Sequence, residues 1–412
     1  RNGRLEHAGR ASRSWKGRKA ESSGRMGAAG SVEGGKTNEE LKTEFLEKLE
    51  AIKTSHPNNL CAKHLTKEYF ESLNEDDQKV LYQCCLTGIE NPDSGLGCYA
   101  MKPSDYETFK PFFDKVIREY HGDETNEKKH VTNWDISDVG EGGVLDVTKL
   151  GLDELSMRVR VGRNLKQYNL PGLMDKEERI KFEQTMLEAF KKLQENEAYG
   201  GTVYSLTPDF GEGVENPNKI SDEKYKELVD AHVMFKDMDA DPYLKSAGIS
   251  SDWPYGRGCY VSEDGQFIIW FGEEDQLRIM CMKKGTKLNE VFDRLNEGLK
   301  VVESIDGIEF ATNEDYGYVT SCPSNLGTGM RASVHVKIPN LTKDGTDAKA
   351  KEICGPLGLS VRGTGGEHTP IGEDGTVDIS PRARLFIQEK EIIAFLYSGI
   401  EKLMEAEKAC AA

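Results

Sequence analysis

The sequence predicts an α+β fold in which a small all-α N-terminal domain precedes a larger domain with an antiparallel β-sheet flanked by helices. Helical spacing of apolar residues dominates the chain to about residue 120, a polar Gly/Asp-rich stretch follows, and strand and helix patterns share the remainder. At 412 residues the chain exceeds one typical domain. We therefore expect these parts: 1–36, a disordered basic and Gly-rich tail; 37–125, a helical domain; 126–150, a linker; 151–412, the larger domain.

The first 25 residues differ in charge from the rest of the chain. They hold eight Lys/Arg and two Asp/Glu, a local charge of +6, so the remainder carries −23 of the total −17. A disordered tail, a remnant of upstream translation and a transit-like peptide all fit this composition. If Met26 were the initiator, Met26-Gly27-Ala28-Ala29-Gly30-Ser31 would match the N-myristoylation pattern. We expect a cytoplasmic protein, with a mitochondrial or membrane-tethered location as the alternatives that this tail leaves open.

Composition excludes several classes of function. A net charge of −17 argues against nucleic-acid binding through a broad basic surface, so an anionic ligand would have to meet a local cluster of arginines. No apolar run approaches the roughly 20 residues of a membrane span. Nine cysteines occur without CxxC or zinc-site spacing, which favours reduced thiols in an intracellular compartment.

Helix signals open the small domain. Thr37 and Glu40 have the spacing of a capping box, and Leu41, Phe45, Leu49 and Ile52 follow at helical intervals. Residues 65–90 and 103–120 carry similar helical patterns. We expect the first hundred residues after the tail to be mainly helical.

Strand signals appear only beyond residue 150. They cover 267–271, 277–280, 315–320 and the alternating stretch 333–338. Helical patterns at 175–196, at 287–303 and around Ile392, Leu396, Ile400 and Leu403 separate or follow them. This mixture predicts one antiparallel sheet covered by helices.

Arginines recur on predicted strands or beside glycine turns. In Arg158-Val159-Arg160 the period of a strand sends both guanidinium groups to one face. Taken alone, that pair is also typical of a solvated sheet face. Arg278, Arg331 and Arg362 occupy comparable places, and five planar, permanently charged donors suit phosphate oxygens. Because GxxxxGK[ST] is absent, ATP would not be bound through a P-loop.

Cys322 lies between the strand-like stretch 315–320 and Pro323-Ser324-Asn325-Leu326-Gly327-Thr328. Near hydroxyls and arginines its thiol could have a lowered pKa and act as a thiolate, although most single cysteines are buried apolar residues. Glu274 opens a strand and Glu367 lies in a Gly-rich stretch. Both are ordinary solvated charges unless their surroundings make them otherwise.

The stretch 322–328 resembles the active-site motif of the phosphagen kinases (ATP:guanidino phosphotransferases), most closely the arginine kinases. The resemblance extends over about residues 38–408 and includes 158–163, 272–278, 330–335 and 361–368. It implies reversible transfer of the γ-phosphoryl group of MgATP to free arginine, which gives ADP and phosphoarginine for energy buffering. A catalytically silent nucleotide-binding homologue and a protein-arginine kinase are the alternatives of other classes.

The resemblance also implies roles for particular residues. Glu274, Cys322 and Glu367 would act in catalysis and hold the guanidinium. ATP would contact Ser156, Arg158, Arg160, His232, Arg278, Arg331, Ser333, His335, Arg362, Thr364 and Gly365. Magnesium would be held by phosphate oxygens and water, with no metal ligand from the protein, and residues 362–371 would form a lid.

The substrate is expected to depend on the loop 94–100. Its Ser-Gly-x-Gly-x-Tyr form resembles arginine kinases, and the amino-acid end of the substrate would lie against Ser94, Gly95, Leu96, Gly97 and Tyr99. Gly-rich backbone amides suit a carboxylate but also a sulfonate, so taurocyamine kinase or another guanidino kinase is an alternative. Glu367 and Tyr120 favour the arginine type. Gly365 and Pro242 depart from it, since many arginine kinases carry Arg at both positions and the second pairs with the residue matching Asp93.

Overall fold

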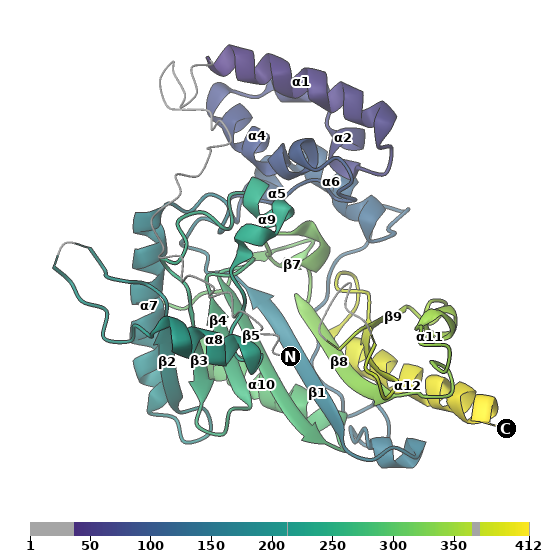
Figure 1. The fold of residues 1–412 in the computed structure, drawn as a ribbon. Helices are drawn as coiled ribbons and strands as arrows, with labels where there is room; N and C mark the ends of the chain where they lie inside the picture. The colour runs from purple at the N-terminus through teal and green to yellow at the C-terminus, as the bar shows by residue number, and fades with distance from the viewer. Residues whose placement is uncertain (1–36, 212, 365–370, 412) are drawn as a thin grey trace, which may run out of the picture.

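The computed structural model describes residues 37–211, 213–364 and 371–411. One eight-stranded antiparallel sheet, in the order β2-β3-β4-β5-β1-β8-β10-β9, forms the centre of the large domain (Figure 1). Its strands are β1 (Leu155–Arg163), β2 (Gly201–Ser205), β3 (Gly258–Ser262), β4 (Phe267–Phe271), β5 (Leu277–Gly285), β8 (Met330–Lys337), β9 (Leu359–Arg362) and β10 (Thr376–Pro381). The predicted α+β class and the strands at 267–271, 277–280 and 333–338 are confirmed.

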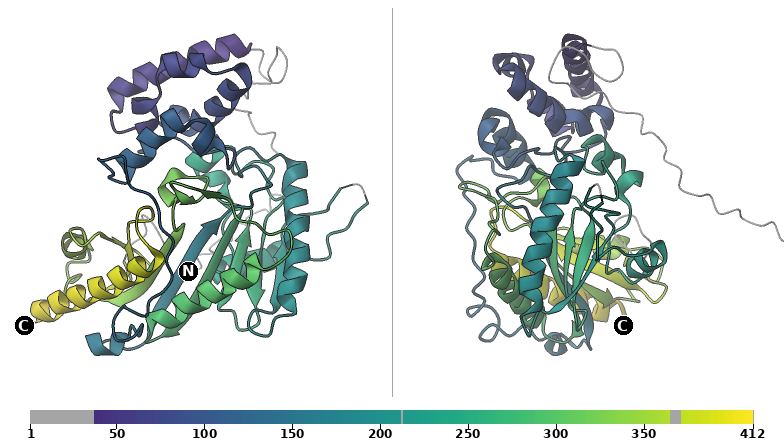
Figure 2. Two further views of the ribbon diagram at one scale, coloured as in Figure 1. Left: turned by 180° about the vertical axis from the view of Figure 1, so that it is seen from behind. Right: turned by 90° about the vertical axis from the view of Figure 1, so that its left-hand side faces the viewer.

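Three long helices cover one face of this sheet, as the view from behind in Figure 2 shows. They are α7 (Lys176–Gln194), α10 (Leu288–Glu303) and α12 (Glu389–Ala411). In β1 the alternate residues Val159 and Val161 are buried in the core beneath them. The residues between, including Arg158 and Arg160, therefore face the opposite side. Shorter elements complete the domain: α8 (Asp222–Asp230), α9 (Pro242–Ser246), α11 (Ala348–Cys354), η1 (Val147–Leu150), η2 (Met238–Ala240) and η3 (Pro323–Asn325).

The small domain is entirely helical, as predicted. It contains α1 (Asn38–Ser55), α2 (Leu60–His64), α3 (Lys67–Ser72), α4 (Glu75–Glu90), α5 (Asp105–Thr108) and α6 (Lys110–Tyr120). The capping box is present: the amide of Thr37 donates to Glu40 Oε2 at 2.7 Å, and the amide of Glu40 donates to Thr37 Oγ1 at 3.3 Å. Among the described residues, no helix combines the length and apolarity needed to cross a bilayer.

The strand expected at 315–320 is wrong in extent. Only the short strands β6 (Thr312–Asn313) and β7 (Gly317–Tyr318) form, as a separate hairpin. Asp315 lies in its turn, where its amide donates to Asn313 Oδ1 at 2.8 Å and its carboxylate meets Lys110 at 2.7 Å. Asp315 is thus held by its turn and by an ion pair to another element, and only Gly317 and Tyr318 have a strand partner.

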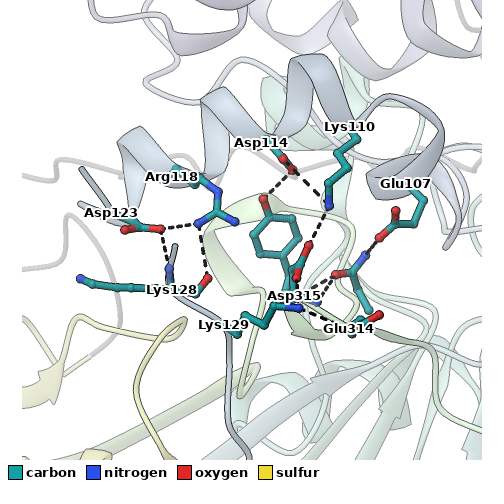
Figure 3. A network of polar contacts seen from close by, with 11 residues as sticks. Glu107, Lys110, Asp114, Arg118, Asp123, Lys128, Lys129, Glu314 and Asp315 are labelled. Carbon is teal, nitrogen blue, oxygen red and sulfur yellow. Dashed lines mark hydrogen bonds and ion pairs between the residues drawn. The ribbon is translucent and has the colours of Figure 1, made fainter. Parts of the chain in front are cut away.

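Ion pairs join the hairpin to α6 and to the segment that leaves the small domain (Figure 3). Lys129 contacts the second oxygen of Asp315 at 3.0 Å, and the hydroxyl of Tyr316 donates to Asp114 at 2.5 Å. Arg118 pairs with Asp123. Deeper in, the hydroxyl of Tyr106 on α5 donates to the carbonyl of Thr320 at 2.8 Å. The segment that leads to Cys322 is thus anchored to the small domain.

Candidate active site

Predicted nucleotide-binding residues form a row on the face of the sheet that lies opposite α7, α10 and α12. The opposed pairs of the β1–β8 ladder are Arg160 with Arg331, Arg158 with Ser333, and Ser156 with His335. Directly opposed residues of an antiparallel ladder point to the same face. The register therefore brings three of the five arginines together with the predicted serines and histidine.

The other two arginines join the row through neighbouring ladders. Arg278 on β5 lies opposite Gly162, which has the same parity as Arg160 on β1. At the other edge Asp378 on β10 lies opposite both His335 and Arg362. All five predicted arginines consequently share one face, called the arginine face below (Arg158, Arg160, Arg278, Arg331 and Arg362).

Burial and the closeness of other positive charges lower the pKa of two arginines on this face. Burial, followed by the charges of Arg278 and Arg331, lowers the pKa of Arg158 to about 10. The pKa of Arg160 is also lowered well below its usual value, by burial and then by Arg278 and Arg158. Guanidinium groups that repel one another in a buried place are stabilised by a polyanion. The chemistry of this donor set fits the phosphates of ATP.

Trp270 supports two of these arginines. The guanidinium carbons of Arg158 and Arg278 each lie 5.5 Å from the centroid of its ring, within cation–π range. The indole Nε1 donates to the carbonyl of Val233 at 2.6 Å. This bond holds the segment that carries the exposed residue His232 against Trp270.

Asp378 organises the β8 end of the face and was not predicted from the sequence. It forms an ion pair with Arg331 and lies 3.5 Å from Nε2 of His335. Burial raises the pKa of Asp378, but the hydrogen bond with His335 and the charge of Arg331 outweigh burial, and the net shift is downward. The role of Asp378 depends on which strands pair with β10, and a single sequence does not reveal strand pairing.

Asp378→Asn should raise the KM for ATP roughly tenfold and lower the free energy of unfolding by about 1–3 kcal/mol, because Arg331 loses its buried charged partner. Initial rates and chemical unfolding measure the two effects. Asp374→Asn is the matched control, since Asp374 pairs with Lys337 at 2.6 Å on the exposed surface. Equal effects of the two substitutions would contradict a role for Asp378 at the nucleotide.

Glu274, Cys322 and Tyr99 lie close to one another beside the arginine face, because the amide of Ala100 donates to the carbonyl of Ser321 at 2.8 Å and so joins the loop 94–100 to the segment before Cys322. Burial raises the pKa of Tyr99 well above its usual value, and the next causes are the charges of Cys322 and Glu274. Burial, then Glu273 and Asp275, raises the pKa of Glu274 to about 7. Nη2 of Arg278 lies 3.4 Å from Oε2 of Glu274. The predicted catalytic carboxylate and thiol therefore adjoin the predicted substrate loop.

The sequence predicts a lowered pKa for the Cys322 thiol, and this prediction is wrong: the protein groups around the thiol raise its pKa. Cys322 is 8% exposed, and burial followed by the charge of Glu274 raises the pKa of its thiol to about 12. Oγ of Ser324, 3.0 Å from Sγ, acts in the opposite direction but more weakly. The expectation assumed a nearby arginine, whereas the fold places a carboxylate next to the thiol.

Asp275 fixes the loop of Cys322 and was also missed. Its Oδ1 accepts bonds from Nδ2 of Asn164 at 2.8 Å and from the amide of Ser321 at 2.7 Å. A Cβ on Gly162 would lie 2.7 Å from its Oδ2, so this approach needs glycine. The sequence showed adjacent acidic residues at 273–275, but nothing in it distinguished the scaffold from the site.

The loop 94–100 is held mainly by hydrogen bonds to other residues of the small domain. The carbonyls of Gly95 and Leu96 accept bonds from the amides of Leu60 and Cys61 at 3.0 and 2.9 Å. The amide of Gly97 donates to Ser94 Oγ at 3.0 Å, so it is not directed at a ligand. The amide of Gly97, at least, is used within the loop and does not belong to the expected amide cluster for the substrate.

A tyrosine bridges this loop to the large domain. Where Pro242 departs from the arginine kinase pattern, the next residue substitutes for the expected ion pair: the hydroxyl of Tyr243 donates to Asp93 Oδ2 at 2.8 Å. Thr364 is exposed. Gly365 and Glu367, and with them most of the predicted lid, lie outside the described residues.

No group of three or more His, Cys, Asp or Glu in the described part of the chain could hold a metal ion. The arginine face offers donors for phosphate oxygens and no set of metal ligands. A magnesium ion bound as MgATP fits these residues, because the phosphates would bring it.

Two family patterns match the chain. ATP:guanido phosphotransferase, N-terminal domain, matches residues 55–118, and ATP:guanido phosphotransferase, C-terminal catalytic domain, matches residues 181–410. Among curated relatives, the arginine kinase Oct f 2 of Amphioctopus fangsiao is 37% identical over 370 residues, 89% of this chain and 99% of that protein. The testis isozyme of creatine kinase from Oncorhynchus mykiss is 35% identical over 86% of this chain and 89% of its own length.

Solved structures give the same family. The substrate-free duplicated taurocyamine kinase of Schistosoma mansoni has a TM-score of 0.74 and 33% identity over 88% of this chain, which spans only 49% of that longer protein. Lombricine kinase has a TM-score of 0.73 and 31% identity over 86% of this chain and 93% of its own. With both domain patterns matched and the site assembled on this fold, the chain belongs to the ATP:guanido phosphotransferase family, the phosphagen kinases.

Proposed function

We propose that this phosphagen kinase phosphorylates free arginine reversibly, with MgATP as donor. The observation that carries the proposal is the proximity of Tyr99, Glu274 and Cys322 next to the arginine face, which follows from the hydrogen bond of Ala100 to Ser321 and the 3.4 Å contact of Glu274 with Arg278. This arrangement would set a guanidinium site directly beside a phosphate site. The compact loop 94–100 and the arginine kinases among the relatives support arginine as the substrate.

The arginine face would hold the phosphates in line for transfer. Phosphoryl transfer makes little covalent demand on a protein, so positioning and charge stabilisation supply most of the catalysis. Magnesium, when bound as MgATP, would neutralise phosphate charge. Beyond the arginines, we assign to the nucleotide Ser156, His232, Ser333, His335, Thr364 and Gly365.

Glu274 would orient the guanidinium and accept its proton at a carboxylate oxygen. A pKa of about 7 is suited to that task near neutral pH. A guanidinium between Glu274 and Cys322 would supply the positive charge that favours a thiolate at Sγ. Glu367, outside the described residues, would provide the second carboxylate.

Substrate choice is tested by measuring ADP release with arginine, taurocyamine, glycocyamine, lombricine and creatine side by side. Arginine should give the highest kcat/KM. A preference for taurocyamine, the second candidate because Gly-rich amides also suit a sulfonate, would change only the substrate. Absence of turnover with all five would support the silent homologue and contradict the proposal.

We also propose a cytoplasmic location for this enzyme. All nine cysteines are free thiols, eight of them buried, as is usual in a reducing compartment. Fractionation of cells with the natural N-terminus, together with myristate labelling, tests this location against mitochondrial import and against a myristoyl anchor at Gly27.

A further inference from the structure

Arg257 is a fully buried arginine that the proposed reaction leaves without a role. It lies directly before β3 and is not part of the arginine face. Its Nε donates to the carbonyl of Gly272 at 3.1 Å, Nη1 to that of Tyr255 at 2.6 Å and Nη2 to that of Ile249 at 2.8 Å. Burial, followed by the charge of Arg179, lowers its pKa well below the usual value. Because burying a guanidinium is costly, an arginine is suited to this place by its ability to donate in three directions at once.

The carbonyl of Gly272 joins Arg257 to the turn that carries Glu274. The amide of Gly272 donates to the carbonyl of Gln276 at 2.9 Å, which closes the turn between β4 and β5. Gly272 has a φ of 77°, and a Cβ on it would lie 2.0 Å from the carbonyl oxygen of Gly256. Glycine is therefore required here, and it brings the turn into contact with the backbone that leads to Arg257.

Separate contacts hold the other side of this turn. The side chain of Gln276 accepts a bond from the amide of Leu165 at 2.7 Å. Asp275 is fixed by bonds from two neighbouring loops. These contacts follow Glu274 in sequence, whereas Arg257 holds the carbonyl two residues before it. The turn is therefore fixed on both sides of the carboxylate that the reaction would use, and Arg257 supplies the contact on the first side.

Arg257 is itself held by the core of the large domain. The amide of Gly256 donates to Thr207 Oγ1 at 2.8 Å, and Thr207 in turn donates to the buried carboxylate of Glu183 on α7. Glu183 also accepts a bond from Ser205 Oγ at 2.5 Å. These buried bonds connect a helix that covers the sheet to the segment of Arg257. The guanidinium therefore has a fixed position relative to the sheet.

We propose that Arg257 is a positioning residue for phosphoryl transfer, which holds the carbonyl of Gly272 and so keeps Glu274 buried in the site. It would touch neither the substrate nor the nucleotide. The inference rests on the proposed function, because Arg257 would act only through Glu274. Loss of its contact would let the turn move and admit water to the carboxylate. The charged or titratable groups around that carboxylate, all kept in the Arg257 variants below, are Glu273, Asp275, Arg278, Arg160 and Cys322.

The test is the pH dependence of kcat for Arg257→Gln and Arg257→Lys. Arg257→Gln should lower kcat by about 10–100-fold, the usual effect of a misplaced catalytic group. The midpoint of the acid limb, expected near the Glu274 pKa of about 7, should move down by about one pH unit, because burial is the main cause of that raised pKa. Arg257→Lys keeps a charge but cannot reach three carbonyls, so its effects should be smaller. It carries the test if circular dichroism shows that the glutamine variant does not fold.

A double substitution tests whether Arg257 acts through Glu274. In the Glu274→Gln protein, Arg257→Lys should lower kcat by less than about twofold, because the carboxylate to be positioned is already gone. Arg179→Gln is the matched control. Arg179 is 2% exposed, and its Nη2 donates to the carbonyls of Pro171 and Gly248 at 2.7 and 3.3 Å. This variant should be less stable in thermal unfolding, but its acid limb should not move.

The outcomes separate this inference from the proposed function. An unmodified protein without turnover, or without an acid limb that depends on Glu274, would contradict the proposed function. An acid limb that depends on Glu274 but stays at the same pH in every folded Arg257 variant would overturn the positioning role alone. Equal losses of kcat from Arg257→Lys with and without the Glu274 carboxylate would also overturn it.

Discussion

Glu274→Gln should lower kcat for phosphoryl transfer by about 10²–10⁴-fold, the usual contribution of a positioned acid–base group. The amide cannot accept the guanidinium proton, but it keeps the size of the side chain. The affinity for MgADP should change less than about threefold, since Glu274 contacts Arg278 only at 3.4 Å. Steady-state kinetics and calorimetry on the same preparation measure both effects.

Glu273→Gln is the matched control for this substitution. Glu273 lies next in sequence, yet it makes the closer contacts with Arg278, at 2.8 and 2.9 Å. Its loss should weaken nucleotide binding more than it lowers kcat. If both variants lost nucleotide affinity equally, Glu274 would belong to the phosphate site and the proposed division of roles would be wrong.

The pH dependence of the phosphorylation rate is a second test of the role of Glu274. Burial, followed by the charges of Glu273 and Asp275, raises its pKa to about 7. Because the raised pKa favours the protonated form and only the carboxylate accepts a proton, phosphorylation should be slow below pH 7 and rise as pH passes through about 7. The acid limb should vanish in Glu274→Gln. An identical limb in both proteins would assign it to another group.

Cys322→Ala should lower kcat by about 10–100-fold, the range expected when a charge-assisted contact to the substrate is lost. The KM for the guanidine should rise, and the affinity for MgADP should stay within about twofold, because the thiol lies beside Glu274 rather than on the arginine face. Initial rates measured with each substrate varied give kcat and KM, and calorimetry gives the affinity for MgADP.

A buried cysteine elsewhere in the large domain controls for lost packing. Cys354 on α11 is fully buried, and Cys354→Ala removes the same atom from the core. It should lower stability without changing kcat. If the two alanine variants lost kcat in proportion to their lost stability, Cys322 would be a packing residue, the commoner role of a single cysteine.

Patterns among neighbouring residues were sufficient to predict many of the helices and strands and to recognise the family. The capping box at Thr37, the alternation along 333–338 and the helical spacing before residue 120 each depend on neighbours in sequence, so the pattern alone revealed them. The same holds for the Arg-x-Arg pair on β1. Its partners in the arginine face, by contrast, were expected from resemblance and were brought together by strand register.

Contacts between distant segments could not be predicted. Asp378 supports Arg331 from a strand nearly fifty residues later, and Asp275 holds a loop through Ser321. The thiol pKa was mispredicted for the same reason, since its sign depends on which charge the fold places beside Cys322. Each of these residues looks like an ordinary surface or core residue until the sheet order is known.

The most direct test of the central claim is ³¹P NMR of the full chain with MgATP and free arginine. If the arginine face and the Glu274–Cys322 site act together, the γ-phosphate signal should be replaced by the signal of a phosphorus–nitrogen bond, in equal amount to the ADP formed. The appearance of inorganic phosphate alone, or an unchanged ATP spectrum, would contradict transfer to a guanidine.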